Sequence, residues 1–240
     1  MLEKAINRVV ELGKPNIVKH GSDEYSDKKL FRIHNELCAN PLELSTLSSL
    51  IEYIKRSNEN PNGKQFFVHV VSPTRVDLIS TLNSDRERET LVIVKAEVPR
   101  INYDTWMENE KMLIAVQSQF VDDPDTDRAA VLKFAGTVTS GSIKEYGDDG
   151  VTQKATIKHG VTTKAEGIVP SPCRLRPYRT FIEVEQPASE FIFRMREGSG
   201  ETVQCALFEA DGGMWKNEAR SNIRAYLEKE LEDIAIPVIS

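Results

Sequence analysis

The sequence lacks a hydrophobic run long enough to cross a membrane. Apolar runs such as Leu91–Val94 are far shorter than the ~20 residues that a membrane-spanning helix needs. The first residues, MLEKAINRVVELGK, distribute charges throughout the segment, so we expect no signal peptide there. These two absences argue against a membrane protein and against an exported one.

Paired cysteines and enzyme motifs are also missing. The three cysteines, Cys38, Cys173 and Cys205, are widely spaced and form no C-x-x-C pair, which predicts free buried thiols in a reducing cytoplasm. The sequence contains no G-x-S-x-G, P-loop, G-x-G-x-x-G or H-E-x-x-H motif, and its four histidines are scattered singly. We therefore expect no enzyme, no cofactor and no metal site.

The chain has no excess of basic residues. It carries 31 Lys and Arg against 37 Asp and Glu, a net charge of −6. Proteins that wrap nucleic acid non-specifically draw affinity from many cationic contacts with phosphate, so the charge argues against that role but leaves a local basic groove open. The acidic run Asp122–Asp127 is not an EF-hand loop, because Asp127 stands where that loop requires glycine. We expect it to cap the next helix.

What is present is a mixture of helical and strand periodicities. This mixture predicts an α+β fold, with a mostly antiparallel sheet and helices packed on it. The tail Ile234–Ile239 resembles an edge strand, or a segment that reaches a neighbouring subunit. Helices are predicted at 2–12, 41–55, from about 104 to 120, at 127–138 and at 215–231; strands are predicted at 65–71, 75–82, 89–98, 151–158, 178–184, 191–195 and 203–207.

The acidic run also suggests a boundary between two parts of the chain. The first, residues 1–121, would be an α+β half. The second, residues 128–240, would be a β-rich half with a closing helix. One continuous domain is the alternative.

An arginine cluster is the leading candidate for a binding site. Arg174 and Arg176 alternate with Leu175 and so leave the same face of an extended segment, and Arg179 follows closely. The planar guanidinium fits phosphate and carboxylate groups. Lys154 and Lys158 share the polar face of another predicted strand. Three interpretations are open: an anionic ligand, acids of an adjacent subunit, or internal pairing with Glu183, Glu185, Glu190 and Glu209.

Two carboxylates near the last helix form a second candidate. Glu209 and Asp211 flank Ala210 and would project from the same face, as acid–base or metal-binding pairs do. The following Gly212 and Gly213 favour a different interpretation, a turn that caps the next helix.

Three segments resemble a known family. They are VTQKATIKHGVTTK, LRPYRTFIEVEQPASEFIFRM and ALFEADGGMWKNEA, and the similarity covers most of the chain, most densely from Gly150 to Tyr226. They resemble the YfdQ-like family, a domain of unknown function carried by bacteriophages and prophages. The resemblance implies a phage-encoded protein made in the host bacterial cytoplasm, near recombination or defence-evasion genes. It supplies no catalytic residues.

Two functional hypotheses follow. The first is a non-enzymatic, self-assembling homo-oligomer, in line with the strand-like tail and with the frequency of symmetric self-assembly. The alternative is an accessory protein that binds nucleotides or single-stranded nucleic acid. It would use Arg174, Arg176, Arg179, Lys154 and Lys158, with Tyr178 and Phe181 as the aromatic residues that stack on bases.

Overall fold

A computed structural model gives the architecture of the chain. It describes residues 2–28, 40–56, 65–83, 86–139, 142–148, 153–159, 163–168, 170–198 and 202–240, and from residue 138 to 168 it describes the backbone alone. The chain divides into two compact units, Met1–Ala39 and Asn40–Ser240. The suggested boundary at Asp122–Asp127 falls inside the second unit.

The first unit consists of a helix and a hairpin. The helix α1 (Leu2–Gly13) matches the prediction for residues 2–12, and strands β1 (Ile17–His20) and β2 (Asp23–Ser26) pair in antiparallel register. Gly21, with φ of 66°, supplies the left-handed conformation that the tight hairpin turn requires. Every described residue of this unit is exposed, so residues 2–28 have no core of their own.

The second unit contains a five-stranded sheet built around the strands predicted at 65–71, 75–82 and 89–98. The three central strands are antiparallel, as expected, and a short parallel strand lies at each edge. One edge strand comes from the C-terminal tail, so the prediction that the tail adds an edge is confirmed. The strand order is β14 (Val238–Ile239), β4 (Phe66–Ser72), β5 (Arg75–Ser80), β6 (Thr90–Lys95) and β3 (Leu42–Leu44).

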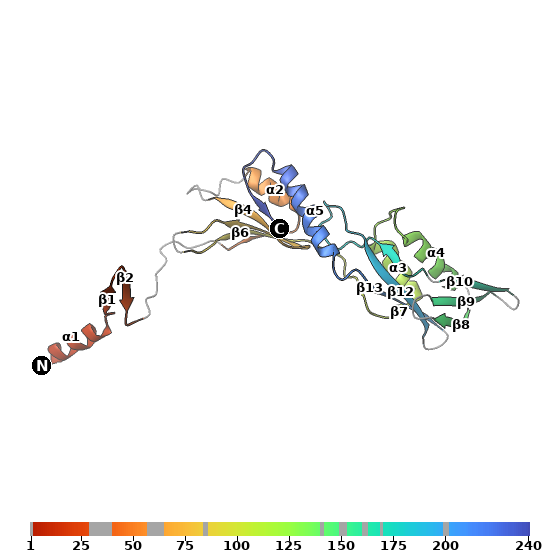
Figure 1. Cartoon of the computed structure of the whole chain (residues 1–240), viewed down its shortest axis with the longest axis horizontal. Helices are drawn as coiled ribbons and strands as arrows, with labels where there is room; N and C mark the ends of the chain where they lie inside the picture. The colour runs from red at the N-terminus through yellow and green to blue at the C-terminus, as the bar shows by residue number, and fades with distance from the viewer. Residues whose placement is uncertain are drawn as a thin grey trace. The chain divides into compact units, whose positions relative to one another are not determined.

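Two helices cover one face of this sheet. Helix α2 (Leu47–Arg56) and helix α5 (Trp215–Glu230) lie on the same side of it (Figure 1). The predicted helix at 215–231 is confirmed as α5, and its i, i+4 spine of Ala219, Ile223 and Leu227 is fully buried. Since burial of apolar surface is the dominant favourable contribution to folding, this face forms the first core.

A four-stranded antiparallel sheet forms a second core with two further helices. The predicted strand at 191–195 is confirmed, and its alternate residues Phe191, Phe193 and Met195 are all buried. Helices α3 (Asn109–Gln119) and α4 (Arg128–Thr139) pack on this sheet. The strand order is β11 (Cys173–Leu175), β12 (Ser189–Glu197), β13 (Val203–Glu209) and β7 (Met107–Glu108).

A three-stranded antiparallel sheet completes the described backbone. Its strands are β10 (Thr163–Ile168), β9 (Gln153–His159) and β8 (Ser142–Asp148), in that order. The predicted strand at 151–158 corresponds to β9. The antiparallel and mixed sheets with packed helices establish the α+β class.

The predicted helix start at Pro41 is wrong. Residues 42–44 are held extended as β3 because they pair in parallel with β6. The helix α2 begins after Thr46, whose Oγ1 accepts the backbone N–H of Ser49 at 3.2 Å.

The predicted helix start at Asp104 is also wrong. Asp104 has φ of 57°, and its backbone N–H donates to the carbonyl of Leu207 at 2.9 Å. The next residues pair with β13 as β7, so the backbone stays extended until Asn109.

The predicted strand from Tyr178 to Val184 is a loop. Within this segment Thr180 and Val184 are buried, whereas Ile182 is 79% exposed. The Gln186 amide accounts for the difference, because its oxygen accepts the backbone N–H of Arg179 and its nitrogen donates to the carbonyl of Phe181. Side-chain hydrogen bonds therefore satisfy backbone groups that a neighbouring strand would otherwise satisfy.

Candidate functional site

The three arginines of the predicted cluster have different environments. Arg174 lies in β11 with an exposed side chain, and its backbone N–H donates to Asp127 Oδ2 at 2.7 Å. The Arg176 guanidinium lies 3.2 Å from an Asp123 oxygen and 3.1 Å from a Glu185 oxygen. Arg179 is buried. The three side chains thus form no common cationic face.

Arg179 is the centre of a buried polar cluster. Its Nη1 donates to Glu209 Oε1 at 2.8 Å, and its Nη2 donates to Ser189 Oγ. The guanidinium carbon lies 3.9 Å from the centroid of the Trp215 ring, a cation–π distance. Only 7% of the Arg179 side chain is exposed. The cluster therefore connects the 178–188 loop, the β12–β13 pair and the start of α5.

The hydrogen bonds continue from Ser189 into the glycine turn. Ser189 Oγ donates to Asp211 Oδ2 at 2.5 Å, and Asp211 Oδ1 accepts the backbone N–H of Gly213 at 2.9 Å. Gly212 and Gly213 have φ of 62° and 82°, which glycine adopts without strain. The residue at the N-cap of α5 is Met214, which makes no side-chain cap. Asp211 therefore serves the turn before the helix, while Glu209 belongs to the ion pair.

The pKa values in the cluster follow from burial and from these contacts. Burial lowers the pKa of Arg179, and the acidic groups around it partly oppose that shift. For Asp211, burial alone would raise the pKa. The hydrogen bonds from Ser189 and Gly213 outweigh burial and hold the pKa below the ordinary 3.8. Burial raises the pKa of Tyr103 well above the ordinary 10.0. The pKa values of Asp211 and Tyr103 thus move away from neutral pH, which suits packing better than proton transfer there.

The acidic groups singled out from the sequence are bound to protein partners. Asp122 pairs with Arg128 at 2.7 Å, and Asp123 Oδ1 accepts the backbone N–H of Asp125. Within the side chains that the structure describes, no three His, Cys, Asp or Glu residues gather as a metal site would require. The Glu209–Asp211 pair instead faces Arg179 and Ser189.

The remaining predicted binding residues are Lys154, Lys158, Phe181 and Tyr178. Lys154 and Lys158 lie on β9, and their side chains are outside the described residues. Phe181 is 1% exposed and packs in the first core, so its ring has no surface on which a base could stack. Tyr178 is half-buried.

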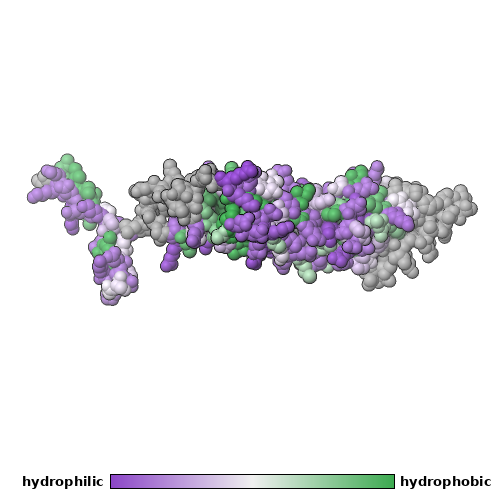
Figure 2. Space-filling model, turned by 90° about the horizontal axis from the view of Figure 1, so that it is seen from above, coloured by the Kyte–Doolittle hydropathy of each residue, from purple (hydrophilic) through white to green (hydrophobic). Residues whose placement is uncertain are grey.

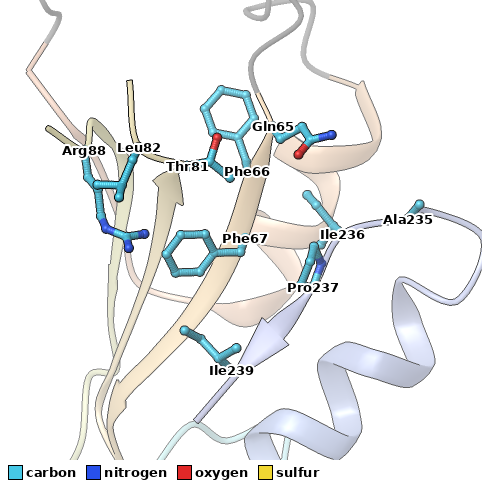
Figure 3. A pocket seen from close by; sticks show the side chains of 10 residues that line it. All are labelled: Gln65, Phe66, Phe67, Thr81, Leu82, Arg88, Ala235, Ile236, Pro237 and Ile239. Carbon is cyan, nitrogen blue, oxygen red and sulfur yellow. The ribbon is translucent and has the colours of Figure 1, made fainter. Parts of the chain in front are cut away.

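An apolar groove that no sequence motif indicated lies beside the five-stranded sheet. It has a volume of about 980 Å³ and opens where β14 meets β4 (Figure 3). The Arg88 guanidinium lies 5.2 Å from the centroid of the Phe67 ring at its wall. The adjacent pair Phe66-Phe67 could have indicated this groove from the sequence. One of two consecutive strand residues must face away from the core, so one aromatic ring is left for the other face of the sheet. The lining residues are Gln65, Phe66, Phe67, Thr81, Leu82, Arg88, Ala235, Ile236, Pro237 and Ile239.

No family model and no curated protein matches the sequence, and no solved structure matches the chain. Among the described residues, no helix has the length and apolar character needed to span a membrane.

Proposed function

We propose that this protein is a non-enzymatic, self-assembling homo-oligomer, encoded by a bacteriophage or prophage and made in the host cytoplasm. The observation that carries the proposal is the first unit, in which α1 and the hairpin present apolar side chains and bury none of them. Exposed apolar surface on this scale marks an interaction site. The large apolar side chains, each 54–78% exposed, are Leu2, Ile6, Val9, Val10, Leu12, Ile17, Val18 and Tyr25.

The Arg179 cluster supports a structural interpretation of the best candidate site. Arg179 is paired with Glu209, and Asp211 receives hydrogen bonds from Ser189 and Gly213. These contacts occupy charged groups that a substrate or a metal would otherwise engage. The cluster also joins elements that are distant in sequence, as structural polar networks do.

The proposed phage origin rests on the resemblance to the YfdQ-like family. Two of the resembling segments meet in space, because Arg179 lies in one and Glu209 and Trp215 lie in the other. The most family-like residues therefore build the buried cluster. This placement supports a structural role for them.

Light scattering coupled to size-exclusion chromatography tests the proposal. We expect a single species whose mass is a multiple of the 27.0 kDa of one chain. A species of one chain at micromolar concentration would overturn self-assembly.

Nucleotide or single-strand binding is the second candidate. The observation in its favour is that Arg174 is exposed on an edge strand of its sheet. Arg176 and Arg179, by contrast, are already paired with carboxylates of the chain. Labelled oligonucleotides at low and high salt test it. The electrostatic contribution is strongest at low salt, so absence of binding there ends this hypothesis.

A further inference from the structure

Helix α1 presents a continuous apolar face. At about 100° per residue its apolar side chains span about 160° of the circumference. Leu2, Ala5, Val9 and Leu12 follow a heptad a/d spacing, and Ile6 widens that seam on one side. Figure 2 shows the hydrophobic residues of this helix gathered along one side and the hydrophilic ones along the other. The face is therefore shaped for packing on other helices.

The elements of the first unit need more contacts than those they make with each other. Isolated helices shorter than about 12–15 residues are marginal in water, and α1 has 12 residues. An isolated two-stranded hairpin is also marginal. Since no described residue of the unit is buried, its own contacts supply little stabilisation. Packing of the apolar face would supply the missing contribution.

We propose that the apolar face of α1 packs against α1 of further copies of this chain, so that the helices of three or more copies form a parallel bundle. This inference rests on the proposed self-assembly and identifies its surface. A strict a/d seam suits two helices, whereas a seam widened by an e position suits a helix with more than one neighbour. The breadth of the α1 face therefore favours three or more copies over two.

Charge on the helix flanks supports parallel neighbours. Glu3 borders the apolar face on one side and Arg8 borders it on the other. In a parallel bundle, opposite flanks of neighbouring helices face each other, so an acidic flank meets a basic one. In an antiparallel pair, each flank would meet its own kind. The exposed Arg8–Glu11 contact of 3.4 Å lies on the outer surface and does not occupy the apolar face.

The same helix is poorly suited to a lipid surface. Interfacial helices carry Lys and Arg on the polar face and aromatic anchors on the other. The charges of α1, from Glu3, Lys4, Arg8 and Glu11, cancel, and the helix has no Trp, Tyr or Phe. A bilayer therefore offers α1 no electrostatic attraction, whereas identical helices offer it matching flanks.

The short length of α1 favours packing against several copies, because a single contact buries little area. A helix of 12 residues is about 18 Å long. One such face buries much less than the roughly 800 Å² per partner of a stable interface. Contact with two neighbours increases the buried area. The exposed Ile17, Val18 and Tyr25 of the hairpin extend the same unit's apolar surface.

The test compares three full-length proteins by light scattering over a range of concentrations. The variant Ile6→Lys with Val9→Lys places charges on the apolar face, and Asn7→Lys places one on the polar face as a control. We expect the wild type and Asn7→Lys to form a species of three or more chains. The double variant should assemble only at a concentration at least about 100-fold higher. Thermal unfolding of the second unit should be the same in all three, which shows that the variants fold.

Each contrary result has a distinct meaning. If the double variant keeps the wild-type mass, α1 is not the surface, although self-assembly stands. If the wild type is a dimer, the bundle of three or more is wrong. If Asn7→Lys also dissociates, added charge alone explains the effect and the assigned face is wrong. If the wild type is a monomer, self-assembly itself fails. If the monomeric wild type sediments with phosphatidylglycerol vesicles and the double variant does not, the occupant is lipid.

Discussion

At the scale of single residues, Arg179 shows how a surface-type side chain becomes part of a core. The N–H groups of its guanidinium pair with Glu209 and donate to Ser189, and the guanidinium lies over the ring of Trp215. Lysine offers neither the fork nor the flat face. The guanidinium thus satisfies several buried groups at one position.

Replacement of Arg179 by Met should destabilise the protein strongly. The substitution leaves Glu209 and Ser189 without their donor, and breaking a buried pair from one side costs about 3–5 kcal/mol. Because Glu209 is 33% exposed, water recovers part of that loss, and we expect a value near ~3 kcal/mol. Urea denaturation followed by circular dichroism measures it.

The matched control is Arg174→Met, on an exposed side chain of the same segment. Surface substitutions of this kind change stability by about 0.5 kcal/mol or less. Equal losses in the two variants would show that the Arg179 contacts contribute little.

At the scale of elements, β12 shows that the burial of a strand's side chains depends on what covers each of its faces. Its burial alternates strictly from Ser189 to Met195, with Phe191 and Phe193 facing the helices α3 and α4. The opposite face carries Ile192 and Arg194. The loop at 178–184 has the same kind of alternation in sequence but no partner strand, so alternation by itself did not make it a strand.

Two substitutions on adjacent residues of β12 should differ widely. Phe193 is fully buried, and Phe→Ala in a core costs about 3–5 kcal/mol. Ile192 is 37% exposed, and Ile192→Ala should cost about 1 kcal/mol or less. Chemical denaturation of both variants measures the difference. Similar costs would mean that both faces of β12 are covered.

At the scale of the whole molecule, the first core assembles segments from both ends of the second unit. Its residues come from 47–94 and from 181–238, and β14 pairs with β4. The first unit, residues 1–39, contributes no buried residue among those described. Stability of the second unit should therefore be independent of the first.

A chain of residues 40–240 should unfold at the same urea midpoint as the full protein. No described side chain of the first unit is buried, so the change should stay within about 0.5 kcal/mol. Removal of residues 237–240 from the full chain is the contrasting control. It deletes β14 and the carbonyl of Pro237, which accepts the Val68 N–H at 2.8 Å, and should cost more than ~1 kcal/mol. A loss of several kcal/mol in the 40–240 chain would show that the units are coupled.

The sequence by itself determined the elements whose burial follows a regular period. The α5 spine and the β12 alternation show which side of a segment faces apolar surroundings, and that information is local. The α1 stripe predicts its helix in the same way, although no residue of that helix is buried. The α+β class follows from these elements together. The glycine pair after Asp211 likewise marks a turn without reference to the rest of the fold.

Only the tertiary structure decided the backbone conformation of segments that pair with a strand distant in the sequence. Leu42–Leu44 became a strand because β6 offers its edge, and Asp104 could not start a helix because the next residues pair with β13. The choice of Glu209 as the partner of Arg179 depends on the β12–β13 register. Hydrogen bonds and ion pairs between distant segments carry no periodic signature, so the sequence showed which groups were available but not which of them meet.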